Sequence, residues 1–360
     1  MRANPFAASS PIEVPRTTAC FCSDSCLRWE RNDASATPFR SLCLAVVFLW
    51  FASAAAQAEP TIRVGSLRYG TLSWELDVIA HCGLSEKYGV RIETLELASV
   101  PAAQLALQAG RVEVILSDWL WVSRQRATGA DLTFVPFSSA IGSLVAGTGS
   151  TVRAVPDLAG QRLGIAGSAI DKSWLVLQLY ARSRFGFDID KNVDKSFGAP
   201  PLLNEELEAG RLDAVLTYWP FAAKLEARGM LPVLTIGEAL TGLGVARDLP
   251  LTGYVFSESW AADNRSAIDG FLAASREAKT ILDQSDTEWE RIAALTGARE
   301  ALELTKLRDA YRQGIPRHWT TEDTNAAERL YRLLAEIGGS ALVGPSRELA
   351  PGTFLAEVNF

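Results

Sequence analysis

Apolar residues along this chain alternate between short unbroken runs, typical of buried strands, and a spacing of three to four residues, typical of helices. Two stretches, residues 101–129 and 201–229, show this alternation with Pro, Gly and Trp residues at the same spacing. Each opens with a Pro that suits a first helical turn, and an Ala-Gly pair then suits the end of that helix. An apolar run follows, and a Trp stands where it ends. Each stretch therefore predicts a helix, a Gly stop, a strand and a Trp at the end of the strand.

The two stretches are copies of one unit. Nine positions are identical across a window of 29 residues, where background composition would give about two. The identical residues of the first copy, each matched 100 positions later, are Pro101, Leu107, Ala109, Gly110, Arg111, Leu116, Trp119, Ala127 and Gly129. Several mismatches are conservative, such as Glu113 against Asp213. Two copies of one unit imply two similar lobes.

The likeness extends upstream of both copies. Similar phrases precede them: Arg63-Val64-Gly65 with Trp74, and Arg162-Leu163-Gly164 with Trp174. A period near 100 residues is too long for solenoids or propellers and indicates domain duplication. Strands alternating with helices imply mostly parallel sheets flanked by helices, with ligands at the carboxyl ends of the strands. The sequence therefore predicts an α/β protein of two lobes with a cleft between them.

Two apolar segments that contain Gly suit the crossings between the lobes. Residues 132–137 lead through residues 138–146 into the second lobe, and residues 251–256 return to the first. We therefore expect residues 59–142 plus 254–360 to form lobe 1 and residues 143–253 to form lobe 2. Apolar residues at helical spacing over 267–282 and 321–337 predict a helical end to lobe 1.

The N-terminus differs from the rest of the chain. A polar stretch precedes an apolar run from Leu42 to Phe51, and Ala56-Gln57-Ala58 follows, which is the pattern of a secretory signal peptide. We predict that residues 1–58 are a leader cleaved after about Ala58, and that the mature chain is periplasmic. Cleavage would leave Cys82 as the one cysteine of the mature chain, so no internal disulfide could form; we expect its side chain to be buried.

Charge and motif content argue against two classes of function. Without the leader, 30 basic residues face 38 acidic ones, a net charge near −8 with no basic stripe, so we expect no nucleic-acid partner. The two histidines, His81 and His318, lie in different regions. Motifs of zinc proteases, serine hydrolases, phosphate loops and dinucleotide sites are missing from the sequence. We therefore expect no catalysis, no cofactor and no metal site.

Four short sequence segments resemble those of a known family. They are Gly110-Arg111-Val112-Glu113-Val114, its copy Gly210-Arg211-Leu212-Asp213-Ala214-Val215, Asp157-Leu158-Ala159-Gly160-Gln161-Arg162-Leu163-Gly164 and Tyr311-Arg312-Gln313-Gly314-Ile315-Pro316. From Thr61 to about Tyr331 the chain resembles the periplasmic solute-binding proteins of nitrate, sulfonate and taurine ABC importers. The resemblance implies a type II periplasmic-binding-protein fold that closes over its ligand. It also implies delivery to an ABC permease and its ATPase in the inner membrane, and we expect a monomer.

Candidate ligand-binding residues lie in two loops that follow predicted strands. The first loop contributes Ser66, Tyr69, Thr71 and Trp74, and the second contributes Ser168, Asp171 and Trp174. Each loop starts a helix, whose unpaired N–H groups and dipole suit a carboxylate or a sulfonate. The same Ser and Thr residues would also suit helix caps that bind nothing, so both interpretations stay open.

A second set comes from the strand ends of the repeat: Asp118, Trp119, Tyr218 and Trp219. One Trp from each lobe could clamp a ligand, or each could pack beneath its own lobe. Asp118 would favour an amine and disfavour a bare inorganic anion. Ser138 and Ser139, at the end of the first crossing strand, are further polar candidates.

These residues predict a small organic anion or zwitterion of the sulfonate and taurine class as the ligand. A heterocycle resembling a pyrimidine or a thiamine precursor is an alternative ligand. A periplasmic sensor partner and an enzyme on the same scaffold are alternative functions.

Overall fold

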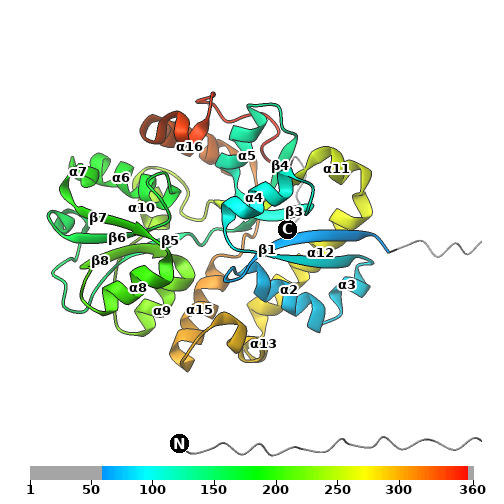
Figure 1. The fold of residues 1–360 in the computed structure, drawn as a ribbon, viewed down its shortest axis with the longest axis horizontal. Helices are drawn as coiled ribbons and strands as arrows, with labels where there is room; N and C mark the ends of the chain where they lie inside the picture. The colour runs from blue at the N-terminus through cyan, green and yellow to red at the C-terminus, as the bar shows by residue number, and fades with distance from the viewer. Residues whose placement is uncertain (1–58, 356–360) are drawn as a thin grey trace, which may run out of the picture. The chain divides into compact units, whose positions relative to one another are not determined.

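The computed structural model describes residues 59–355, so the predicted leader lies outside the described residues. The described residues belong to one compact unit built on two five-stranded sheets flanked by helices (Figure 1). In the described part of the chain no helix is both long enough and apolar enough to cross a membrane. Cys82, which was expected to be buried, is exposed because it follows the last turn of its helix.

Both sheets have the same topology. The first has the order β2-β1-β3-β10-β4, built from β1 Thr61–Leu67, β2 Arg91–Leu97, β3 Val114–Asp118, β4 Leu132–Ser138 and β10 Thr252–Ser257. The second has the order β7-β6-β8-β5-β9, built from β5 Gly142–Ala146, β6 Arg162–Ala166, β7 Asp194–Gly198, β8 Ala214–Tyr218 and β9 Leu231–Thr235. In each sheet three strands pair in parallel, and β10 or β5 runs antiparallel to both its neighbours. The sheets are thus mixed, and the predicted two-lobed α/β fold is confirmed.

Helices follow the strands in the order that the repeat predicts. Those of the first lobe before the crossing are α2 Leu72–His81, α3 Leu84–Lys87, α4 Val100–Gln108 and α5 Trp119–Arg126. Those of the second lobe are a 3₁₀ turn at Val155–Leu158, α6 Lys172–Phe185, α7 Ile189–Asn192, α8 Pro200–Glu208, α9 Trp219–Ala227 and α10 Ile236–Gly242. The C-terminal helices are α11 Glu258–Asp263, α12 Arg265–Gln284, α13 Asp286–Arg291, α14 Ala293–Thr296, α15 Ala301–Gln313 and α16 Thr321–Val343.

The chain crosses between the sheets twice, over residues 139–141 and 243–251. Gly142 already pairs in the second sheet, and Thr252 and Gly253 pair in the first. These residues lie one or two positions from the limits expected from the sequence.

One polar arrangement occurs in both lobes and explains part of the repeat. In the first lobe Arg63 pairs with Glu113 and donates to the carbonyl of Gly110 at 2.9 Å. In the second, Arg162 pairs with Asp213 at 2.7 Å and donates to the carbonyl of Gly210 at 3.0 Å. Each Arg thereby ties the first strand of the repeated unit, β1 or β6, to the turn before the third, β3 or β8, so the Arg, the acid and the Gly recur together.

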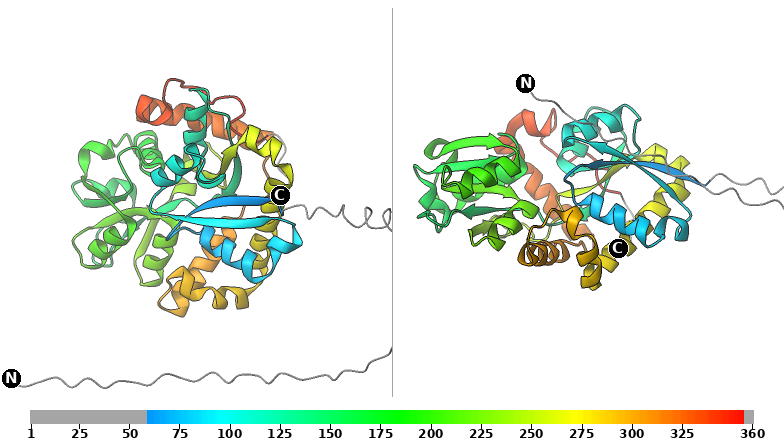
Figure 2. Two further views of the ribbon diagram at one scale, coloured as in Figure 1. Left: turned by 45° about the vertical axis from the view of Figure 1, so that its right-hand side comes forward. Right: turned by 60° about the horizontal axis from the view of Figure 1, so that its bottom comes forward.

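The C-terminal helices contact both lobes (Figure 2). α12 packs against α2 and α3 of the first lobe, α15 packs against α9 of the second, and α16 lies against both α5 and α6. A continuous cluster of buried apolar residues contains Trp119 of the first lobe, Trp174 of the second and Tyr331 of α16. The helical end assigned to lobe 1 therefore also holds the second lobe.

Candidate functional site

A cavity of about 230 Å³ lies where the two lobes face each other. The carboxyl ends of β1, β3 and β4 border it from the first sheet, and the carboxyl end of β8 borders it from the second. The first turns of α2, α4, α6 and α9 also reach it. This is the position at which strands of α/β sheets present ligands.

An ion pair crosses this cavity from lobe to lobe. Asp118 Oδ2 lies 3.6 Å from Lys172 Nζ, and both residues line the cavity. Asp118 ends β3 and caps α5, because its Oδ1 accepts the backbone N–H of Trp121 at 2.9 Å. Burial lowers the pKa of the Lys172 ammonium, but the carboxylates of Asp118 and Asp171 raise it by more, so the net shift is upward. Lys172 is therefore a cation, held between two acids.

A second polar pair stands beside the first. The Tyr218 hydroxyl donates to Asp171 Oδ2 at 3.1 Å, and Asp171 Oδ1 caps α6 by accepting the N–H of Ser173. Burial and then the charge of Asp171 raise the pKa of Tyr218 far above its ordinary value, so the phenol stays neutral. Gly167 permits this contact: its φ is +94°, and a Cβ there would lie 2.8 Å from the Tyr218 hydroxyl.

The remaining walls are largely apolar. Leu67, Val100, Phe137, Ile141 and Phe221 line the cavity beside the ion pair. Tyr69 also lines it and has 79% of its surface exposed, which places it at the mouth. A ligand here would meet the carboxylate of Asp118, the ammonium of Lys172 and several hydrocarbon or aromatic faces.

Trp219 joins the two lobes at the edge of this cavity. Its ring stands perpendicular to that of Trp74, 5.8 Å away, and lies 6.4 Å from that of Tyr311. Trp219 begins α9 of the second lobe, whereas Trp74 and Tyr311 belong to α2 and α15. Trp74 is buried behind Trp219 and does not line the cavity, contrary to expectation.

Of the residues proposed from the sequence, six line the cavity: Tyr69, Thr71, Asp118, Ser138, Tyr218 and Trp219. Asp171 reaches it indirectly, through Tyr218 and Lys172. Ser66 is buried in β1 and does not line the cavity, although both its neighbours do. Ser168 is exposed outside the cavity, and Ser139 borders a separate groove behind the crossing. Alternation along β1 turns Ser66 away, and the Ser139 hydroxyl donates to the carbonyl of Gly314 at 3.4 Å instead of facing the cavity.

Trp119 and Trp174 do not line the cavity, contrary to expectation. Trp119 has no exposed surface, donates its indole N–H to the carbonyl of Pro250 at 3.0 Å and packs against Tyr331. Trp174 is 1% exposed in the same buried cluster. Both side chains point from the first turn of a helix into the core, so neither can clamp a ligand in this arrangement.

Lys172, Phe137 and Phe221 line the cavity but were not among the proposed site residues. The sequence held one signal for Lys172, because it directly follows the cap Asp171 and so begins a helix at the carboxyl end of a strand. Within residues 59–355, no group of His, Cys, Asp and Glu is arranged to hold a metal ion.

Comparison with known proteins shows which fold the chain has. No family model and no curated protein matches the chain. Among solved structures, the alkanesulfonate-binding protein SsuA from Xanthomonas axonopodis pv. citri bound to MOPS is similar, with a TM-score of 0.63 and 17% identity. That match covers 82% of this chain and 98% of the other.

Two further solved structures are similar over comparable lengths. The periplasmic aliphatic sulphonate binding protein SsuA from Escherichia coli has a TM-score of 0.66 and 18% identity, over 84% of this chain and 94% of that one. The ligand binding component of an ABC-type import system from Staphylococcus aureus, with zinc bound, has a TM-score of 0.60 and 14% identity, over 82% and 96%. The chain therefore has the type II periplasmic-binding-protein fold, as the sequence resemblance predicted.

Proposed function

We propose that this protein is the ligand-binding component of an ABC importer and captures a small organic zwitterion of the taurine and aminosulfonate class. The ion pair of Asp118 and Lys172 carries the proposal, because it presents one charge of each sign from opposite lobes inside one cavity. A ligand with an ammonium and an acid group could insert between the two, so its binding would draw on both lobes. The bound protein would then deliver the ligand to a permease and its ATPase in the inner membrane.

The acid group of the ligand belongs beside Lys172. The ammonium of Lys172 stands at the first position of α6, so the helix dipole adds to its charge. The first turn of α2 also reaches the cavity without a side-chain cap; the N–H groups of Ser73 and Trp74 donate to the carbonyls of Gly70 and Thr71, so the N–H of Leu72 is the donor that it offers. These donors suit the oxygens of a sulfonate or a carboxylate.

The ammonium of the ligand belongs beside Asp118. With Asp171 nearby, the site has two carboxylates for one ammonium, which disfavours a ligand that carries only negative charge. One similar protein was solved with MOPS, whose molecule combines an amine and a sulfonate. The aromatic rings of Phe137 and Phe221 favour a second candidate ligand, a cationic heterocycle such as a pyrimidine precursor.

Isothermal titration calorimetry with four probes tests the proposal: taurine, MOPS, ethanesulfonate and ethylamine. We expect taurine or MOPS to bind at least tenfold more tightly than the two probes with a single charged group. Asp118→Asn keeps an oxygen for the helix cap but removes the charge, so it should abolish this preference and weaken binding of the zwitterion about 10- to 100-fold.

Glu336→Gln, an exposed change on α16, is the matched control and should leave all four affinities unchanged. Equal affinity for taurine and ethanesulfonate, or an unchanged preference in Asp118→Asn, would contradict the assignment of the ligand class. A heterocycle that binds while all four probes fail would favour the second candidate.

A further inference from the structure

The ligand cavity and the groove behind the crossing share one wall. The groove has a volume of about 540 Å³ and is lined by α9, α15 and both crossing segments. Three residues line both the cavity and the groove: Ala140, Ile141 and Trp219. Ala140 and Ile141 belong to the crossing chain itself, and Trp219 has the largest side chain of the three. The indole ring is therefore the largest part of this wall that a substitution could remove.

Small side chains surround the ring on the groove side. Ala222 and Ala223 follow Trp219 by one turn of α9 and line the groove. Ala310 and Gly314 line it from the end of α15. None of these four residues has a side chain that could take the place of an indole. Removal of the ring would therefore join the cavity to the groove.

The ring of Trp219 is held from behind by buried neighbours. It contacts Trp74 and Tyr311, with ring centroids 5.8 and 6.4 Å away. Trp74 has only 4% of its surface exposed, and the Tyr311 hydroxyl donates to Glu75 Oε1 at 2.6 Å. These contacts do not involve a ligand, so the partition is in place before one binds.

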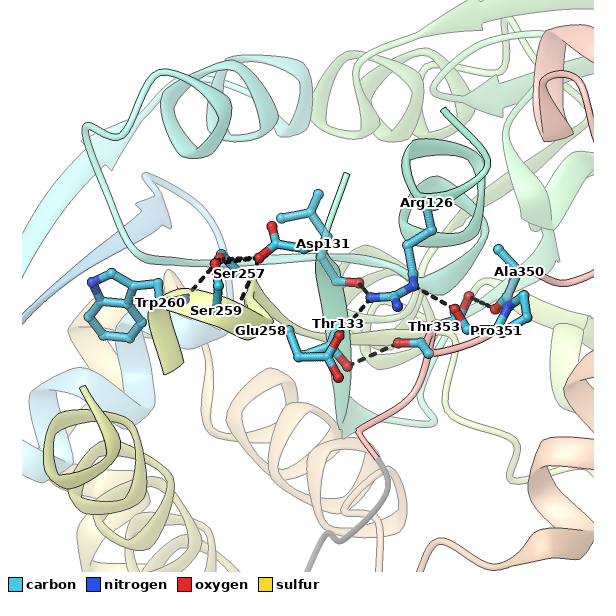
Figure 3. Close-up of polar contacts among 12 residues, drawn as sticks. Arg126, Asp131, Thr133, Ser257, Glu258, Ser259, Trp260, Ala350, Pro351 and Thr353 are labelled. Carbon is cyan, nitrogen blue, oxygen red and sulfur yellow. Dashed lines mark hydrogen bonds and ion pairs between the residues drawn. The ribbon is translucent and has the colours of Figure 1, made fainter. Parts of the chain in front are cut away.

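The equivalent Trp of the first lobe has protein packed behind it. Phe354 lies edge-on to Trp119, with ring centroids 5.9 Å apart. The chain just before Phe354 is fixed, because the Arg126 guanidinium donates to the carbonyl of Pro351 at 2.6 Å (Figure 3). The C-terminal segment thus fills the space behind Trp119, whereas the groove lies behind Trp219.

The volumes of the two spaces indicate what the partition does. Pockets for drug-sized ligands measure about 300–1,000 Å³. The ligand cavity alone, at about 230 Å³, falls below this range, and joined to the groove it would fall within it. We propose that Trp219 limits the length of the ligand, so that the site accepts a short zwitterion with a primary amine and excludes one whose amine carries a ring. This inference rests on the proposed function and narrows its ligand class, since it favours taurine over MOPS with its morpholine ring.

Isothermal titration calorimetry with taurine and N-cyclohexyltaurine tests the length limit. Both probes carry one ammonium and one sulfonate, and they differ only in the ring on the amine. We expect the natural chain to bind taurine at least about tenfold more tightly. In Trp219→Ala this preference should disappear, because taurine loses a contact while the cyclohexyl ring gains the space of the groove. A preference of the same size in Trp219→Ala would overturn the proposal.

Phe221→Ala is the matched control, since Phe221 lines the ligand cavity but not the groove. It removes an aromatic ring from the same helix and enlarges the cavity on another side, so the preference for taurine should remain. An equal loss of preference in Phe221→Ala and Trp219→Ala would mean that any added space admits the longer probe, and the partition would be refuted.

A second change should restore the limit. Ala310→Phe, added to Trp219→Ala, places a ring in the space that the cyclohexyl group would use. We expect the double variant to prefer taurine again by about tenfold. Ala310→Phe alone should bind both probes as the natural chain does, because it lies behind the partition. A double variant that binds N-cyclohexyltaurine as tightly as Trp219→Ala would place the cyclohexyl ring outside the groove and contradict the proposal.

The same titrations separate this inference from the proposed function. A natural chain that binds both probes equally would overturn the length limit and leave the zwitterion site standing. If neither probe binds to any of these proteins, the proposed function fails, and the length limit fails with it.

Discussion

Trp119 and Trp219 occupy equivalent positions of the repeat and have different surroundings. Each is the first residue of a helix, α5 or α9, that follows the third strand of the repeated unit, β3 or β8. Trp119 is wholly buried, under Tyr331 of α16 and Phe354 of the C-terminal segment. Trp219 is partly exposed, lines the cavity and contacts Trp74 and Tyr311.

The difference comes from the part of the chain that the repeat does not contain. Duplication gave both lobes the same strands, turns and helix starts, so the two Trp backbones are placed alike. The C-terminal helices then cover the two lobes differently: α16 lies over α5, and α15 lies along α9. An internal repeat therefore predicts where a residue stands in its lobe but not what packs over it.

Truncation of the two Trp residues should separate their roles most clearly. Trp119→Ala should destabilise the protein by about 3–5 kcal/mol, because it leaves a large hole in a closed core. Trp219→Ala should cost about 1–2 kcal/mol, the worth of its edge-on contacts and partial burial. Urea unfolding measures both costs. At a temperature where each variant is folded, ligand affinity should fall about tenfold in Trp219→Ala and stay unchanged in Trp119→Ala.

Trp119→Phe is the control for the first change, since it keeps much of the buried ring and should lose only part of the stability. Similar costs for the two alanine variants would mean that the C-terminal helices do not distinguish the lobes as described.

The glycines that end the first helix of each repeat should behave alike, in contrast to the Trp pair. Gly110 and Gly210 have φ of +64° and +69°, and a Cβ at either position would meet no atom within 4 Å. Substitution by Ala should therefore cost only the backbone strain of the left-handed region, about 1–2 kcal/mol at each site. Urea unfolding of Gly110→Ala and Gly210→Ala should give matching losses, and a clear inequality would show that these turns are not equivalent.

Most of the fold was predictable because it depends on local pattern. Apolar runs, Gly stops and the Arg and acid phrases gave both lobes and the approximate crossings. Gly142 and Thr252 already pair in strands, close to the lobe limits expected from the sequence. The limits differ slightly because the crossing chain adds an antiparallel strand to each sheet, and no local signal marks where pairing begins.

The site was harder to predict because it depends on side-chain direction. Asp118, Tyr218 and Trp219 line the cavity, as their position at strand ends predicts, but Trp119 and Trp174 turn into the core. Lys172 lies in no motif that fixes the direction of its side chain, and its ion pair depends on the approach of Asp118 from the other lobe. The sequence of one lobe does not indicate which residues of the other lobe it contacts.

The smallest expected effect concerns the pair of Arg162 and Asp213 and depends on pH. The hydrogen bonds from Arg162 hold the pKa of Asp213 below its ordinary value, although burial opposes them. Because the carboxyl is more acidic in the folded protein than in the unfolded one, the pair contributes stability above the ordinary Asp pKa of about 3.9 and loses it as the pH falls through the folded value. The contribution should be below about 1 kcal/mol, since the Arg162 side chain is nearly half exposed. Asp213→Asn should therefore be slightly less stable than the natural chain at pH 7, and the gap should narrow as the pH falls below the ordinary Asp pKa, as measured by urea unfolding from neutral to acid pH. Arg162→Met should show the same convergence, and a constant gap at every pH would mean that the pair acts through packing, not charge.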